Sequence, residues 1–421
     1  MAAAIEIKKQ ETTYFELTAL GLLSLVIGVL AGAVDTFFGK ILLFLSAFRE
    51  SHFLPLILFL PIIGICFTYL FQKYGDRSPQ GMNLVFLVGQ EEEKDIPLRL
   101  IPFVMVGTWL THLFGGSAGR EGVAVQLGAT IANRLGNWVR LEKYASTLIM
   151  IGMAAGFAGL FETPIAATFF ALEVLVIGKF SHHALLPALL AAFTASTTSQ
   201  WLGLEKFSLM LPQSVDLTIP VFLKLLVIGL IFGMVGGSFA GCLETMKRIM
   251  KRRFPNPLWR IGIGALALVL LFVLLYQGRY SGLGTNLISA SFTNQPIYSY
   301  DWLLKLVLTV LTISSGFLGG EVTPLFAIGS SLGVVLAPLF GLPIELVAAL
   351  GYASVFGSAT STLFAPIFIG GEVFGFQNLP FFVIVCSVAY FISKPYSIYP
   401  LQKTSAMGQT RGSGGHHHHH H

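Results

Sequence analysis

Apolar runs separated by short polar segments are the most regular feature of the chain. Leu17–Phe48 and Phe53–Phe71 open the series, and glycine or proline interrupts many of the later runs. Those runs are Leu98–Leu113, Val123–Val139, Ala145–Leu160, Pro164–Ile177, Ala184–Trp201, Val221–Met246, Ile261–Tyr276, Trp302–Ile313, Pro324–Leu342, Ile344–Val355, Leu363–Phe374 and Leu379–Ile392. Several are shorter than the roughly 20 residues that a membrane-spanning helix needs. The pattern predicts a membrane protein with whole and broken helices, and broken helices are typical of transporter binding sites.

The two halves of the chain resemble each other at three places, at offsets of 201, 200 and 199 residues. The matching segments are Leu25–Val34 with Leu226–Val235, Gly119–Val123 with Gly319–Thr323, and Ala171–Val174 with Gly370–Val373. About five spans in each half, an odd number, would place the repeats in opposite orientations. We therefore expect an all-α polytopic membrane protein of two inverted-topology repeats, built from broken and tilted helices that meet near the midplane.

The predicted organisation follows from these repeats. It comprises a cytoplasmic N-terminal segment (1–14), a first repeat (15–205), a linker (206–220), a second repeat (221–393), a pore-proximal C-terminal segment (394–405) and a linker with a hexahistidine tag (406–421). The tag is excluded from the fold.

Composition supports the membrane assignment. The 421 residues are 54% hydrophobic and 11% charged, whereas a soluble domain carries about 25% charged residues. The densest basic cluster, Lys247–Arg253, and the lysines near both termini predict that the termini are cytoplasmic. Orientation accounts for this cluster, so we expect no nucleic-acid partner. Neither the histidines outside the tag nor the three cysteines have metal-ligand or disulfide spacing, and we expect no metal and no cofactor.

The central motif is Gly119-Arg120-Glu121-Gly122-Val123, which lies in nearly uncharged sequence. Ionisable residues at membrane depth usually mark an ion or proton path. The flanking glycines predict a helix break, after which the free amides of the next helix form a site for an anion. The Glu121 carboxylate would occupy this site or yield it to a solute anion. The alternative is a short extramembrane loop with a salt-bridged pair.

A second candidate stretch is Gly81–Phe86, where proline and glycine precede an apolar helix. Asn83 needs a partner or a ligand at membrane depth. Met82 and Phe86 are candidates for the same site, Phe86 through its positive ring edge, although both residue types more often fill a core.

The third stretch, Gly319–Pro324, supplies a second carboxylate in apolar sequence, Glu321, with Val322 and Thr323 after it. Thr323 can cap the helix that starts there. Glu321 is either a second titrating group or, as we favour, a structural acceptor for loop amides.

The fourth stretch follows the last apolar run and contains Tyr396 and Tyr399. Either phenol can point into an ion path, or both can form an aromatic belt at the membrane interface. The lysine-proline spacing favours Tyr396, and an extra turn of helix would favour Tyr399.

Together these residues resemble the CLC superfamily of chloride channels and anion/proton antiporters. Gly119–Val123 resembles its G-K/R-E-G-P motif, and Gly319–Pro324 resembles its G-G-x-F-x-P motif. Gly152–Phe157, with Pro164 and Glu173, resembles the G-x-A-A-x-F…P-x-x-G…E-E block. The resemblance implies a homodimer in the lipid bilayer with one anion pore per subunit, Glu121 as the gating glutamate, and the other central-motif residues lining the anion site.

Four departures from that pattern resemble the fluoride-transporting clade of bacterial CLC proteins. The G-S-G-I-P motif is replaced by Gly81–Val85, the proline by Val123 and the second glutamate by Val174, while the third stretch carries Glu321 and Thr323. This resemblance implies exchange of cytoplasmic fluoride for external protons across a bacterial inner or plasma membrane. Glu121 would be both the gate and the proton carrier. The matching positions at or near the ion path are Met82, Asn83, Phe86, Glu321, Val322, Thr323 and one of the two C-terminal tyrosines.

Two other functions compete with fluoride/proton exchange. A chloride/proton antiporter or chloride channel is the alternative within the same family, and Met82 in place of a serine argues against it. An intramembrane enzyme is disfavoured, because the chain has no H-E-x-x-H motif and no paired aspartates in its apolar runs.

Overall fold

The computed structural model describes residues 2–177, 181–393 and 396–404. The first half contains α1 (Ala2–Ser51), α2 (Phe53–Ile57), α3 (Leu60–Tyr74), α4 (Met82–Gly89), α5 (Leu100–Leu113), α6 (Glu121–Trp138), α7 (Ala145–Phe161), α8 (Pro164–Val174) and α9 (Leu185–Trp201). The second half contains α10 (Ile219–Arg253), α11 (Pro257–Leu274), α12 (Thr285–Phe292), α13 (Asp301–Ser315), α14 (Val322–Phe340), α15 (Ile344–Thr360), α16 (Phe364–Phe374) and α17 (Leu379–Ser393). A two-stranded parallel pair, β1 (Val176–Ile177) and β2 (Lys403–Thr404), joins the end of the described chain to the first half.

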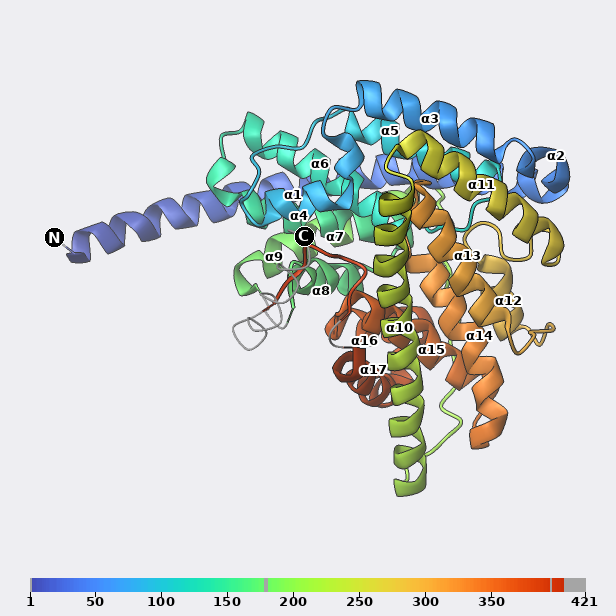
Figure 1. Ribbon diagram of the computed structural model, residues 1–421. Helices are drawn as coiled ribbons and strands as arrows, with labels where there is room; N and C mark the ends of the chain where they lie inside the picture. The colour runs from blue at the N-terminus through green and yellow to red at the C-terminus, as the bar shows by residue number, and fades with distance from the viewer. Residues whose placement is uncertain (1, 178–180, 394–395, 405–421) are drawn as a thin grey trace.

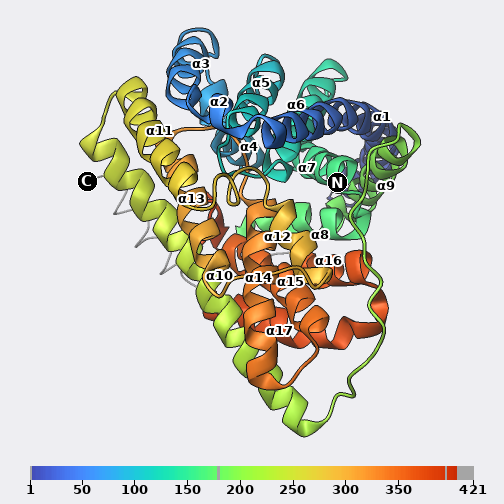
Figure 2. The same cartoon turned by 90° about the vertical axis from the view of Figure 1, so that its right-hand side faces the viewer.

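Six of the described helical segments are long and apolar enough to cross a membrane: Tyr14–Ser51, Glu142–Phe161, Ile219–Arg253, Pro257–Leu274, Val322–Phe340 and Phe376–Ser393. Shorter apolar helices, including α5, α8, α15 and α16, lie between them. Figures 1 and 2 show most of the first half, in blue to green, on one side of the molecule and most of the second half, in yellow to red, on the other, while α11 lies beside α3. Figure 2 shows α10 along one flank. The mixture of long and short helices is the broken-helix architecture that the sequence predicted.

The two halves repeat the same packing. Helix α6 packs on α7 as α14 packs on α15, and α1 packs on α9 as α10 packs on α17. Glycines allow the closest crossings: Gly128 lies against Gly152 between α6 and α7, and Gly329 lies against Gly351 between α14 and α15. A Cβ at any of these four positions would collide with the facing backbone. Small residues at such crossings are how membrane helices approach closely enough to pack.

Two buried carboxylates bind the repeats together. Glu173 on α8 accepts hydrogen bonds from the amides of Leu363 (3.0 Å) and Ala365 (2.7 Å) at the start of α16. Its equivalent on α16, Glu372, accepts hydrogen bonds from the amides of Ile165 (3.2 Å) and Ala166 (2.6 Å) at the start of α8. Each carboxylate thus caps a helix N-terminus in the other repeat, where free amides and the helix dipole favour a negative charge.

Several boundaries differ from the expected apolar runs. The run Phe53–Phe71 is divided between α2 and α3, and the run Pro164–Ile177 ends as helix at Val174 before β1 begins. Helix α10 begins at Ile219, inside the expected linker, because Thr218 caps it by accepting a hydrogen bond from the Val221 amide. The tag and its linker lie outside the described residues.

Candidate functional site

The two glycine-rich motifs meet in a short antiparallel bridge. The Gly119 amide donates to the Gly320 carbonyl (2.5 Å), and the Gly320 amide donates to the Gly119 carbonyl (2.9 Å). A Cβ at Gly119 would lie 3.0 Å from Cδ of Pro324, and a Cβ at Gly320 would lie 3.0 Å from the Gly122 amide nitrogen. Both contacts would be tighter than a Cβ usually makes, so glycine suits these positions, and the bridge brings the starts of α6 and α14 together.

Glu121 is the first residue of α6, and its side chain is fully buried. The hydroxyl of Thr323, in the first turn of α14, lies 2.7 Å from Oε1 and 2.6 Å from Oε2 of this carboxylate. Because a hydroxyl has one hydrogen, these contacts are one hydrogen bond shared between two oxygens. Nε of Arg120 lies 3.8 Å from Oε1 of Glu121, which makes a buried ion pair. A carboxylate from one repeat is thus held by a hydroxyl from the other.

Glu321 has a different environment from Glu121. It is the N-cap residue of α14 and is partly exposed, while Val322 after it is buried. In the alignment of the repeats, the partner of Thr323 is Val123, which is also buried and has no hydroxyl to offer Glu321. The structure therefore joins Glu121 to the other repeat and leaves Glu321 without the reciprocal bond.

The C-terminal segment places Tyr399, not Tyr396, beside the other candidate residues. The Tyr399 ring is 6% exposed and lies 5.3 Å from the Phe86 ring, centroid to centroid. Its buried hydroxyl has no hydrogen-bond partner in the part of the chain that is described. Tyr396 is 47% exposed and packs against Gly241 of α10. Lys394 and Pro395, which favoured Tyr396 in the sequence, lie outside the described residues.

Helix α4 contributes residues that differ in exposure. Gly81, with φ of 55°, breaks the chain just before α4. Met82 is half-buried, and its Cε lies 3.9 Å from where a Cβ on Gly122 would be. Phe86 is buried and Asn83 is exposed. The structure thus brings Met82 and Phe86 to the site, while the Asn83 side chain has access to solvent.

Gln126 was missed by the sequence analysis. Its Oε1 atom is buried without a hydrogen-bond partner among the described residues, and lies 3.5 Å from where a Cβ on Gly81 would be. A single glutamine on α6 belongs to no motif, and only its polarity within an apolar run could have singled it out. Unpartnered polar atoms such as these are expected where a ligand or water binds.

The geometry has the features that suit a small anion. The N-termini of α6 and α14 meet there, and each presents free amides and the positive end of a helix dipole. The Arg120 guanidinium adds a charge, and its Nε and Nη1 atoms are buried without hydrogen-bond partners in the described chain. The Glu121 carboxylate lies at these same N-termini, so it can compete with a dissolved anion for the site.

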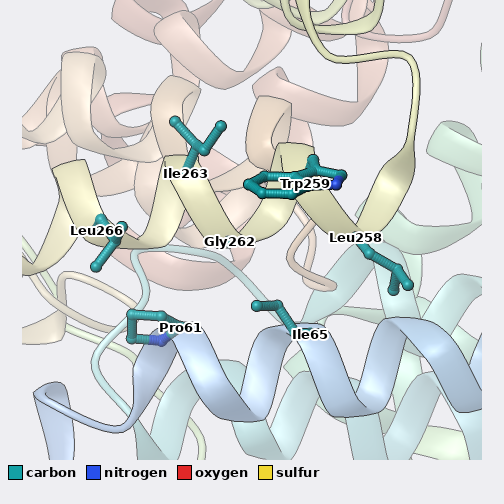
Figure 3. Close-up of a pocket in the computed structure, with 7 residues that line it drawn as sticks. All are labelled: Pro61, Ile65, Leu258, Trp259, Gly262, Ile263 and Leu266. Atoms are coloured by element: carbon teal, nitrogen blue, oxygen red, sulfur yellow. The ribbon is translucent and has the colours of Figure 1, made fainter.

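An apolar groove of about 310 Å³ elsewhere on the molecule lacks this chemistry. Figure 3 shows Pro61 and Ile65 of α3 opposite Leu258, Gly262 and Leu266 of α11. None of its lining residues is ionisable, so it has no side chain that could gate an anion or carry a proton.

Comparisons with solved structures define the class of protein. The chain superposes on a slow cyanobacterial Cl⁻/H⁺ antiporter with a TM-score of 0.76 at 19% identity, covering 93% of this chain and 98% of the other. It superposes on a eukaryotic CLC transporter with a TM-score of 0.72 at 18% identity, covering 92% of this chain and 74% of the other. The fold is therefore the all-helical membrane fold of CLC transporters, as the sequence predicted.

Sequence comparison then gives the family. The voltage gated chloride channel family model matches residues 63–394. A chloride/fluoride channel protein of Pseudomonas syringae pv. tomato is 35% identical over 386 residues, which are 90% of this chain and 85% of that protein. The voltage-gated ClC-type chloride channel ClcB of Salmonella typhimurium is 26% identical over 300 residues, 68% of this chain and 70% of that protein. The chain belongs to the CLC family of anion channels and transporters, which are not enzymes.

Proposed function

We propose that the protein is a fluoride/proton antiporter that exports cytoplasmic fluoride in exchange for external protons. The observation that carries this proposal is the position of the Glu121 carboxylate at the joined N-termini of α6 and α14, held by Thr323. In this scheme the carboxylate leaves the anion site when it is protonated, and fluoride takes its place. One group then couples the two ions, and Arg120, Thr323 and Tyr399 line the site from three elements.

Fluoride is favoured over chloride by two observations. Met82 stands where the family has an anion-coordinating serine, and the relative with 35% identity is named a chloride/fluoride channel protein. Export also fits fluoride chemistry, because HF is a weak acid that enters cells from acidic surroundings and dissociates inside. Expelling the trapped ion requires energy, which an inward proton gradient supplies.

The arrangement in the membrane is part of the same proposal. The basic end of α10, Lys247–Arg253, and Lys403 lie at the ends of described helices and strands that would face the cytoplasm of a bacterial cell. Two copies are proposed to form a homodimer, each with its own pore, as the family resemblance implies.

A flux assay tests the proposal. Purified protein is reconstituted in liposomes loaded with potassium fluoride or potassium chloride, and a fluoride electrode and a pH probe are read with and without valinomycin. We expect fluoride efflux coupled to proton uptake, with chloride passing much more slowly, and loss of proton uptake in Glu121→Gln. Proton uptake that persists in Glu121→Gln would contradict the shared-carboxylate scheme.

The second candidate is chloride/proton exchange, because the cyanobacterial antiporter with the same fold carries chloride. Chloride flux equal to fluoride flux in the same liposomes would favour it. Met82 would then be a packing residue.

A further inference from the structure

A second group of orphaned polar atoms lies at the C-terminal end of α7, apart from the Thr323 contact. Asp35 of α1 is fully buried, and neither carboxylate oxygen has a hydrogen-bond partner among the described residues. A Cβ on Gly159 would lie 2.5 Å from Oδ2 of Asp35, so the carboxyl group packs directly on α7. An ionisable side chain this deep in a membrane protein is costly, and packing alone does not require it.

Glu162 follows Gly159 by three residues, at the same end of α7. It adopts a left-handed conformation (φ 58°) as the C-cap residue, and it is 4% exposed. Its Oε1 and the hydroxyl of the next residue, Thr163, are both buried without a partner in the part of the chain described. Four unpartnered oxygens from Asp35, Glu162 and Thr163 therefore gather at one helix end.

The charges around the two acids differ. Glu162 lies within electrostatic reach of Arg120 and Lys206, which come from the start of α6 and from the segment after α9. Asp35 is instead surrounded mainly by apolar packing, and Lys40, about one turn further along α1, donates a hydrogen bond to the Leu202 carbonyl (2.7 Å). Glu162 thus lies between two cations, the exposed Lys206 and Arg120, which precedes Glu121.

A helix C-terminus carries partial negative charge and disfavours a nearby carboxylate. The second repeat has no acid at the equivalent positions, where Gly236 and Ser361 replace Asp35 and Glu162. The same crossing can thus be built without carboxyl groups.

We propose that Glu162, with Asp35 behind it, is the proton donor that supplies Glu121 from the side of the molecule where Lys206 lies. The Glu162 carboxyl gives its proton to a bridging water, which passes one to the Glu121 carboxylate. Glu162 is left as a carboxylate and Glu121 as a carboxylic acid, and Asp35 or external water then reprotonates Glu162. In the proposed orientation this side is extracellular, because α1 runs outward toward Ser51 and Lys206 lies beyond the parallel end of α9. The inference rests on the proposed proton exchange.

The test uses full-length protein in liposomes with a fluoride gradient, with external pH varied from acidic to alkaline. Glu162→Gln should slow proton-coupled fluoride flux about a hundredfold at alkaline external pH, the lower range for loss of a positioned proton-transfer group. The rate should recover at acidic external pH, when water can protonate Glu121 directly. Asp35→Asn should show the same pH dependence with a smaller loss.

Fluoride affinity, measured by calorimetry, should stay unchanged in both variants, which separates proton supply from damage to the anion site. The matched control is Glu345→Gln, an exposed carboxyl in the first turn of α15, which should behave as the wild type. If the amide variants do not fold, Glu162→Asp and Asp35→Glu keep the acid, and a shifted pH profile is then expected.

Two failures are distinguishable. Wild-type flux without proton uptake would overturn the proposed antiport itself. Coupled wild-type flux with wild-type behaviour of the Glu162 and Asp35 variants at every external pH would overturn only this inference.

Discussion

The crossing of α1 with α7 and the crossing of α10 with α15 occupy equivalent places in the two repeats but contain different chemistry. In the first, the Asp35 carboxyl packs on Gly159 without a hydrogen bond from any described residue. In the second, Gly236 packs on Ser358, whose hydroxyl bonds to the Val355 carbonyl (3.2 Å). In the second crossing the polar side chain is hydrogen-bonded to the backbone. The first crossing instead holds a buried acid, although the equivalent crossing is built without one.

Other positions are the same in both repeats. Glu173 and Glu372 cap each other's helices through two amides each. The comparison teaches a distinction: a contact present in both repeats belongs to the architecture, whereas a residue present in one repeat is a candidate for the ion or proton path. Thr323, paired with Val123, and Asp35, paired with Gly236, fall in the second group.

The largest effect should come from breaking the symmetric caps. Glu173→Ala removes two charge-assisted hydrogen bonds, and we expect it to lower the free energy of unfolding by about 3–5 kcal/mol. Glu372→Ala should cost nearly as much, and less only because Glu372 is partly exposed whereas Glu173 is 7% exposed. Thermal and denaturant unfolding of the detergent-solubilised protein measures both. A neutral outcome for either variant would contradict the reciprocal architecture.

The second largest effect is expected from removing the Thr323 hydroxyl, which the first repeat lacks. Thr323→Val makes the two repeats alike and deletes the hydrogen bond to the Glu121 carboxylate, a loss of about 1.5–3 kcal/mol. We expect Glu121 to leave its present position in a structure of the variant, and proton-coupled flux to fall at least roughly tenfold. Thr323→Ser keeps the hydroxyl and should retain most of the flux. A Thr323→Val protein with wild-type flux would remove Thr323 from the mechanism.

The fold was more predictable from the sequence than the site. The repeat offset aligned Glu173 with Glu372 and Glu121 with Glu321, because equivalent helices need equivalent residues. The sequence did not indicate that Glu173 and Glu372 cap each other, since a cap between repeats depends on how the halves dock. Asp35, Glu162 and Gln126 were not singled out, because no motif contains them and their significance is the absence of a partner in the described structure.

The choice between Tyr396 and Tyr399 likewise required the tertiary structure. Both residues lie in one polar segment, and spacing along the chain does not show which ring turns inward. The segment returns toward α4, so that Tyr399 meets Phe86 while Tyr396 stays against α10. Tertiary packing, not local sequence, makes that distinction.

A smaller effect is expected at the second crossing. A Cβ on Gly236 would collide with Oγ of Ser358 and lie 2.8 Å from the Val355 carbonyl oxygen. Gly236→Ala should therefore destabilise the protein by about 1–3 kcal/mol through overpacking. Adding Ser358→Gly, which copies Gly159 of the first repeat, should recover most of the lost stability in the same unfolding assay. Gly237→Ala is the control, because its nearest contact would be an ordinary 3.5 Å from Cα of Ser393.

The smallest change in stability should come from Asp35→Asn, at the equivalent place in the first repeat. Asparagine has nearly the same shape, and no hydrogen bond is lost because the carboxyl makes none with the described residues. We expect the free energy of unfolding to change by less than about 1 kcal/mol, while proton supply at alkaline external pH falls. A substitution that hardly affects stability but alters proton movement is what a functional acid predicts. If Asp35→Asn instead destabilises as strongly as Glu173→Ala, Asp35 is architectural, and the difference between the two crossings reflects packing alone.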